Sequence, residues 1–226
     1  MEKQIGFFLA WAAVLLTWTL GFASEISPGI TADEALKKLL DGNQNFLASR
    51  LTIGDFSGPD TRRAVAAGQK PYAIILSCSD SRVPPEIIFN KGLGEIFVVR
   101  VAGNIPDPIV LGSIEYAAEH FGSPLILVLG HNRCGAVSAA VNARGRPHGN
   151  IGAIIEKIAP AVKKAREDAR GATNADLVEL AVNNNIKLVA KSLVDQSPVI
   201  RSLVGEGKLK IVGAKYDLDS GTVEIL

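Results

Sequence analysis

The chain has 226 residues, of which 47% are hydrophobic and 21% are charged. This length and composition are typical of one compact domain with a substantial buried core. Because 24 basic residues stand against 23 acidic ones, charge gives no reason to expect a nucleic acid or an anionic membrane as partner. A small neutral or anionic substrate is the better match.

The first 23 residues have the features of a secretory signal peptide. Lys3 precedes an apolar run over residues 5–22, and Gly21 and Ala23 are small residues at positions −3 and −1 of a cut after Ala23. The run is also close to the roughly 20 residues that span a bilayer, so an uncleaved membrane anchor is the alternative. We expect cleavage, a periplasmic or secreted product without stable membrane association, and one domain over residues 24–226.

The segment after residue 30 predicts a leading helix. Thr31 and Glu34 match a capping box, and the leucines that follow are spaced as in an amphipathic helix running towards Phe46. Residues 51–69 contain several glycines and little periodicity, which predicts mostly loop with a short helix possible at 61–67.

Helix and strand patterns alternate through the rest of the chain. Continuous apolar runs predict strands buried on both faces at residues 72–77, 96–101 and 125–129. Helical patterns cover residues 107–121, 134–143, 151–170 and 174–193. The alternation indicates an α/β fold with a mainly parallel central sheet flanked by helices. Two further strands, around a turn and at a sheet edge, are predicted at residues 209–216 and 222–226.

The chain has two cysteines, Cys78 and Cys134, and an even count in an exported protein first indicates a disulfide. Each cysteine lies shortly after a predicted buried strand and close to another potential ligand, Asp80 or His131. A bound metal would hold both thiols as thiolates and protect them from oxidation. Disulfide and metal site are therefore the two interpretations.

The polar residues after two of the strands favour the metal site. Cys78 follows the first strand, and His131 and Cys134 follow the third. Ligands gather beyond the carboxyl ends of strands in α/β sheets of this kind. A Cys2His set is a recognised ligand set for catalytic zinc that leaves one position open, and its softness favours zinc over magnesium or calcium. Each short motif is weak alone, but together they predict one Zn²⁺ per subunit.

Four segments resemble the β-class carbonic anhydrases. They are Cys78-Ser-Asp-Ser-Arg82-Val-Pro-Pro, Phe97-Val-Val-Arg-Val-Ala-Gly-Asn104, Ser113-Ile-Glu-Tyr116 and Gly130-His131-x-x-Cys134-Gly-Ala. The resemblance extends from about Ala32 to the C-terminus and is most specific over residues 69–141. It implies the fold of that family with an N-terminal helical arm, and assembly as a homodimer or homotetramer.

The activity that the resemblance implies is that of a carbonic anhydrase, or carbonate dehydratase. Zinc-bound hydroxide would attack carbon dioxide to give bicarbonate and a proton, because zinc lowers the pKa of bound water towards neutrality. By similarity to the family, Asp80 accepts a hydrogen bond from the hydroxide and Arg82 holds the Asp80 carboxylate. In a closed state, Asp80 would become the fourth zinc ligand instead.

The resemblance also implies a substrate pocket, which for carbon dioxide should be mostly apolar with one or two donors. The matching positions are Gln69, Phe97, Ala102, Tyr116 and Gly135. The Gln69 side chain and the Gly135 backbone N–H would be the donors. For Phe97 and Tyr116, packing in the core is an equally good interpretation.

Two departures from the family pattern stand out. Ile75 occupies the position where some bacterial members carry a tryptophan of an inhibitory bicarbonate site, although Arg100 matches the basic residue of that site. Asn132 and Arg133 stand between the predicted ligands His131 and Cys134, where a small residue is common after the histidine. The sequence does not indicate what the second departure does.

Other functions remain open at this stage. The same site could hydrolyse carbon disulfide or carbonyl sulfide, as related proteins do. Alternatively, the protein could be non-catalytic and bind zinc or bicarbonate, with Asp80 as a permanent fourth ligand. His120 and His148 are candidate proton shuttles because histidine titrates near neutral pH, but a helix end and an exposed loop explain them as well.

Overall fold

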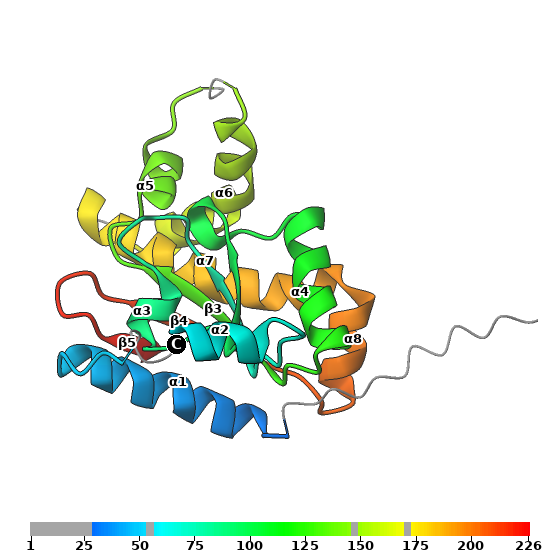
Figure 1. Ribbon diagram of the computed structural model, residues 1–226. Coiled ribbons are helices and arrows are strands. Elements are labelled where there is room, and N and C mark those ends of the chain that lie inside the picture. The colour runs from blue at the N-terminus through cyan, green and yellow to red at the C-terminus, as the bar shows by residue number, and fades with distance from the viewer. Residues whose placement is uncertain (1–28, 53–56, 146–148, 170–172) are drawn as a thin grey trace, which may run out of the picture.

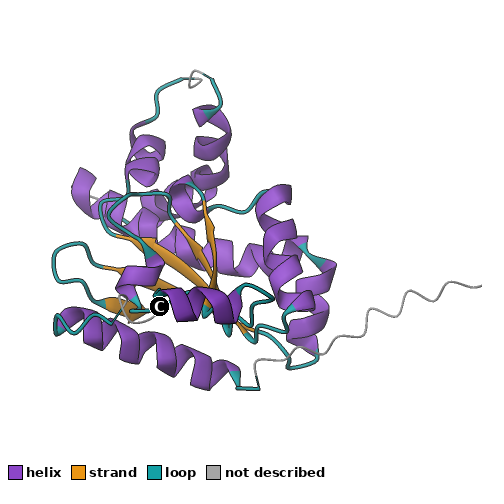
Figure 2. Cartoon of the chain, viewed as in Figure 1, coloured by secondary structure: helices purple, strands orange, loops and turns teal. Residues whose placement is uncertain are grey.

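A five-stranded sheet in the order β2-β1-β3-β4-β5 forms the centre of the fold (Figures 1 and 2). The structure is a computed structural model that describes residues 29–52, 57–145, 149–169 and 173–226. The predicted signal peptide and His148 lie outside these residues. The strands are β1 (Ala73–Ser77), β2 (Ile96–Arg100), β3 (Leu125–His131), β4 (Lys210–Tyr216) and β5 (Val223–Ile225). Pairing is parallel from β2 to β4, and only β5 is antiparallel to its neighbour.

Helices cover both faces of this sheet. They are α1 (Ala32–Leu47), α2 (Pro59–Val65), α3 (Pro85–Ile88), α4 (Pro108–His120), α5 (Gly135–Asn142), α6 (Ile151–Asp168), α7 (Asn174–Gln196) and α8 (Pro198–Gly205), with a 3₁₀ turn, η1 (Ala102–Asn104). Alternate strand residues enter opposite layers, as the two-residue period of a strand requires. Ile74 and Ile126 pack with residues of α4 to α8, whereas Ile75 and Leu127 pack with residues of α1 and α3. In Figure 1, α1 and α7 accordingly lie on opposite sides of the sheet.

The predicted α/β fold with a mainly parallel sheet is therefore confirmed. The leading helix begins as expected, because Thr31 and Glu34 form both hydrogen bonds of the capping box. Asp107 caps α4 in a similar way, accepting from the backbone N–H groups of Ile109 and Val110. Among the described residues, no helix combines the length and apolarity needed to cross a membrane.

Some elements differ from the sequence-based expectation. The prediction that β2 is buried on both faces is wrong, because β2 is an edge strand and only Ile96 is buried. The third strand is longer than predicted: β3 continues to His131 because it stays paired with β4 as far as Tyr216. The short helices α3 and α8 were not predicted, and one or two turns give too little periodicity to detect.

Buried Asn43 ties the C-terminal hairpin to α1. Its Nδ2 donates to the carbonyl oxygens of Gly221 (2.9 Å) and Ile88 (3.2 Å), and its Oδ1 accepts from the Val223 N–H (3.1 Å). These bonds satisfy backbone groups that would be costly to bury without partners. The turn between β4 and β5 is thereby held beside the carboxyl end of β3.

Candidate metal centre

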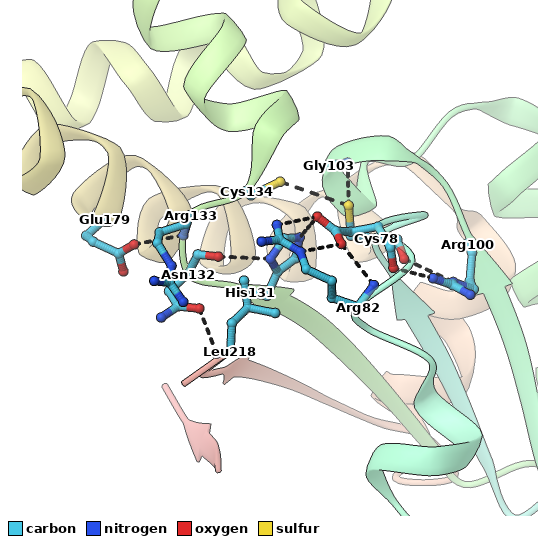
Figure 3. A network of polar contacts seen from close by, with 11 residues as sticks. Cys78, Arg82, Arg100, Gly103, His131, Asn132, Arg133, Cys134, Glu179 and Leu218 are labelled. Carbon is cyan, nitrogen blue, oxygen red and sulfur yellow. Dashed lines mark hydrogen bonds and ion pairs between the residues drawn. The ribbon is translucent and has the colours of Figure 1, made fainter. Parts of the chain in front are cut away.

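Cys78, His131 and Cys134 come together at the carboxyl edge of the sheet (Figure 3). Cys78 directly follows β1, His131 is the last residue of β3, and Cys134 is the residue before α5. All three are buried, and their ligand atoms lie within 4.8 Å of one another. The parallel pairing of β1 with β3 produces this convergence, because Ser77 stands opposite Leu129.

The two sulfur atoms are separate thiols and not a disulfide. Their distance is 4.0 Å, about twice the length of a disulfide bond. Two thiolates bound to one tetrahedral zinc ion at about 2.3 Å each would stand roughly 3.8 Å apart. The disulfide alternative is therefore contradicted, and the spacing fits a shared metal ion.

The His131 ring is oriented for metal binding through Nε2. Its Nδ1 lies 2.9 Å from the backbone oxygen of Asn132. A carbonyl oxygen can only accept, so Nδ1 carries the proton and Nε2 presents its lone pair. In the described part of the chain this buried Nε2 has no hydrogen-bond partner. An unpaired buried nitrogen is costly, and a metal ion would satisfy it.

The two thiols share their protons unequally. The hydrogen bond with the Cys134 thiol lowers the pKa of Cys78 below its usual range despite burial. The Gly103 N–H, 3.3 Å from the sulfur, acts in the same direction. The pKa of Cys134 is raised, first because its proton is engaged with Cys78 and second because it is buried.

Asp80 lies next to this group and is held by Arg82. The Arg82 guanidinium donates to both carboxylate oxygens, from Nε to Oδ1 at 2.9 Å and from Nη2 to Oδ2 at 2.7 Å. The Arg82 backbone N–H adds a third bond, at 3.0 Å to Oδ1. These bonds hold the pKa of Asp80 well below its usual range. The carboxylate is therefore a pure acceptor, with Oδ2 only 3.8 Å from His131 Nε2.

Sequence reasoning missed the residues that fix the loop after β1. Arg100, at the end of β2, donates to the backbone oxygens of Cys78 (3.0 Å) and Asp80 (2.7 Å). Asn185 of α7 donates to the Gly103 oxygen at 2.9 Å, on the residue whose N–H meets the Cys78 sulfur. The family resemblance connects Arg100 only with a regulatory site, but its position beside the end of β1 in the predicted sheet is a signal for this role.

The predicted pocket residues fall into two groups. Ala102 lies in η1 beside Gly103, and Gly135 begins α5 directly after Cys134. Both are therefore next to residues that contact or form the group of Cys78, His131 and Cys134, which we call the metal group. They are the predicted pocket positions that the fold of this chain brings to the site.

Gln69, Phe97 and Tyr116 lie away from the metal group of the same chain. Gln69 is exposed and precedes β1, at the end of that strand opposite to Cys78. Phe97 pairs with Ile74, four residues before Cys78, which is about 13 Å along a strand. These positions share the amino end of the sheet and not its carboxyl edge.

Tyr116 belongs to an aromatic cluster on α4 and β2. Tyr116 is 49% exposed. Its ring meets the Phe121 ring edge-on, with the ring centroids 5.3 Å apart, and the Phe121 and Phe97 centroids are 6.1 Å apart. His120 ends α4 and packs on Tyr116 at 4.6 Å, so it stands with this cluster. Ile75 is fully buried in the sheet.

Fold and site together define an α/β protein with a Cys2His metal group at the carboxyl edge of a parallel sheet. The sequence model of the carbonic anhydrase family matches residues 73–223, which contain the whole group. Carbonic anhydrase 2 of Mycobacterium tuberculosis is 43% identical over 197 residues, covering 86% of this chain and 92% of that protein. The carbonic anhydrase of Mycolicibacterium smegmatis is 38% identical, covering 84% and 91%.

Solved structures agree with the sequence comparison. The Coccomyxa β-carbonic anhydrase in complex with acetazolamide has a TM-score of 0.71 and 27% identity, over 84% of this chain and 86% of that one. A tetrameric β-carbonic anhydrase of Sordaria macrospora has a TM-score of 0.67 and 25% identity, over 85% and 97%. The chain belongs to the β-class carbonic anhydrase family.

The thiol state is directly testable. Protein denatured in a metal chelator without reductant is expected to expose two titratable thiols per chain, because the sulfurs are 4.0 Å apart and unbonded. The Cys78→Ser variant should expose one. A wild-type count near zero, restored by a reductant, would show that the cysteines are paired.

Proposed function

We propose that this protein is a zinc-dependent carbonic anhydrase, a carbonate dehydratase that converts carbon dioxide and water to bicarbonate and a proton. The observation that carries the proposal is the buried group of Cys78, His131 and Cys134 with Asp80 held beside it, in a chain of this family. The ligand types, the sulfur spacing and the orphan Nε2 all fit zinc. We therefore assign one Zn²⁺ per subunit to these three side chains.

Zinc, when bound, would supply a hydroxide nucleophile near neutral pH, because it lowers the pKa of water. The three protein ligands leave one tetrahedral position for this chemistry. Since they come from two strand ends and a helix start, the sheet keeps them in place. The protein thus contributes a fixed site and a defined direction of attack.

Asp80 orients the nucleophile. As an ionised carboxylate it can accept but not donate, so a nucleophile beside it must direct its hydrogen towards Asp80. A lone pair is then free to face carbon dioxide, which places the reacting atoms without further rearrangement. Arg82 keeps the carboxylate in this position through its three bonds. A closed state with Asp80 as fourth ligand would require those bonds to break.

The substrate pocket begins at Ala102 and Gly135. Ala102 offers a small apolar surface, which suits an uncharged molecule of low polarity. Gly135 is the first residue of α5, and its backbone N–H can donate to a developing bicarbonate oxygen. These two residues would therefore contact carbon dioxide and bicarbonate from the same chain that binds the metal.

The Asp80→Asn variant tests the orienting role. Its amide can donate and no longer attracts Arg82, so kcat for carbon dioxide hydration should fall by on the order of 100-fold while zinc content stays at one per chain. The measurements are stopped-flow hydration at pH 8.5 and elemental analysis. Asp33→Asn, which changes an exposed acid on α1, is the matched control and should keep full activity.

Two results would count against the enzyme assignment. If the zinc-loaded wild type hydrates carbon dioxide no faster than buffer, the proposal is wrong. If Asp80→Asn loses zinc, Asp80 is a ligand and the site is closed or structural. Release of sulfide from carbon disulfide or carbonyl sulfide, measured in parallel without hydration, would favour the sulfur substrates.

We also propose that the enzyme works as a homodimer or a multiple of dimers whose copies share residues. Gln69, Phe97 and Tyr116 match substrate-binding positions of the family but lie far from the metal group of their own chain. They can serve in catalysis only if they reach the site of a second copy. The open edge of β2 and the exposed side of α4 offer a surface for such pairing.

Mixed oligomers show whether Gln69 serves the metal site of its own chain or that of a second copy. Asp80→Asn and Gln69→Ala chains are co-expressed in equal amounts, and hydration is compared with the mean of the separate variants. If Gln69 serves the partner's metal, each hybrid dimer contains one intact site, and activity should rise to roughly a quarter of wild type. An activity equal to the mean would show that Gln69 does not act across copies.

We propose that the protein is exported to the periplasm or the medium. Lys3, the apolar run over residues 5–22 and the small residues Gly21 and Ala23 support a signal peptide, which would leave one domain over residues 24–226 in the periplasm or medium. Intact mass of the exported protein is expected to correspond to a chain that begins at Ser24. A chain that keeps residues 1–23 and sediments with membranes would instead support an uncleaved anchor.

A further inference from the structure

The structure explains Asn132, the residue that departs from the family pattern directly after His131. It is 8% exposed, and its polar atoms are engaged on two sides (Figure 3). Its backbone oxygen accepts from His131 Nδ1 at 2.9 Å. Its side chain donates from Nδ2 to Asp217 Oδ2 at 2.7 Å and accepts from the Leu218 N–H at 2.8 Å. Asn132 thus connects the metal group to the turn after β4.

That turn is itself tightly bonded around Asp217. Asp217 Oδ1 accepts from the Ser220 backbone N–H (2.8 Å), the Ser220 hydroxyl (2.9 Å) and the Asp219 N–H (3.1 Å). The Asn132 N–H also donates to the Tyr216 oxygen at 3.2 Å, which continues the β3–β4 ladder. The Asn132 side chain therefore binds a turn with little freedom to move.

Arg133 completes the connection between the two ligands. Its φ of +50° is in the left-handed region, which is uncommon for a residue other than glycine. Glu179 of α7 accepts from its backbone N–H at 3.0 Å, and Asp219 pairs with its guanidinium at 2.8 Å. The segment from His131 to Cys134 is thus held by α7 on one side and by the turn on the other.

We propose that Asn132 is a positioning residue for His131, and that the turn Asp217–Gly221 is, through Asn132, a working part of the metal centre. The backbone oxygen of Asn132 selects the tautomer and the direction of the His131 ring. The side-chain bonds of Asn132 to Asp217 and Leu218 hold that backbone oxygen in place. Partners of this kind behind a metal ligand typically contribute 10- to 100-fold in metal affinity. This inference rests on the zinc site proposed above.

The Asn132→Asp variant removes the Nδ2 donor and places a carboxylate against Asp217. The new carboxylate can still accept from the Leu218 N–H. Zinc affinity, measured by competition with a chromophoric chelator, is expected to fall about 10-fold. The visible absorption bands of the Co²⁺-substituted protein should also shift, because the imidazole changes its orientation.

The double variant Asn132→Asp with Asp217→Asn is the rescue. The new amide at position 217 can donate to the new carboxylate at position 132, and its oxygen can still accept from Asp219 and Ser220. Zinc affinity and the Co²⁺ spectrum should return to within about twofold of wild type. Asp217→Ala, which lies outside the ligand segment, should weaken zinc in the same direction as Asn132→Asp.

A stability control distinguishes a loss of His131 positioning from a general loss of stability of the fold. Ser123→Ala removes a buried hydrogen bond to the Pro71 oxygen (2.6 Å) at the opposite edge of the sheet. It should lower Tm yet leave zinc affinity and the Co²⁺ spectrum unchanged.

Three results would overturn the inference. They are wild-type zinc affinity in both Asn132→Asp and Asp217→Ala, a double variant as weak as Asn132→Asp, or loss of zinc in Ser123→Ala. A wild type that binds no zinc would instead refute the proposed zinc site, and this inference with it.

Discussion

The parallel pairing of β1 with β3 is the constraint on which the site depends. Because the two strands run in the same direction and in register, Cys78 and His131 leave the sheet at one edge. Cys134 reaches the same point because it lies three residues after the end of β3 and directly before α5, so the metal group needs only one short connection. The apolar strands thus do more than build a core, since their register sets the spacing of the ligands.

Polar contacts from several elements then convert this convergence into a defined geometry. Arg82 holds Asp80, Arg100 holds the backbone around Cys78, and Asn132 holds the His131 ring. Asn185 of α7 acts on the same loop through Gly103. Arg82, Arg100 and Asn185 donate from side chains far apart in the sequence, whereas the Asn132 backbone oxygen accepts from the His131 ring. Removing the Asn185 amide would leave the buried Gly103 oxygen unpaired, which is more costly than losing an exposed contact.

The aromatic cluster of Phe97, Tyr116 and Phe121 is separated from the metal group of the same chain. The chain carries its ligands at the carboxyl edge of the sheet, while Phe97 and Tyr116 stand near the other end of β1 and β2. A compact single copy cannot bring both to one substrate. The catalytic role proposed for these residues would therefore require association between copies, and the exposed Tyr116 offers a surface for it.

Much of this could be predicted from the sequence, because apolar runs and capping residues act locally. The continuous run before Cys78 and the capping box at Thr31 required only neighbouring residues, and both are present in the structure. Whether a strand lies at the edge or in the centre of a sheet depends on its neighbours and not on its own sequence, so the burial of β2 was predicted wrongly. The short α3 and α8 were missed for lack of periodicity.

The sequence by itself determined the alternation of the strands with the longer helices, the candidate Cys2His set and the family, since these depend on residue identity and spacing along the chain. Only the tertiary structure decided that the sulfurs stand 4.0 Å apart, that Asn132 joins His131 to Asp217, and that Gln69 lies away from its own metal group. The physical reason is that hydrogen bonds and metal sites depend on distances between residues that are remote in sequence. Those distances are set by strand register and helix packing, which no local pattern encodes.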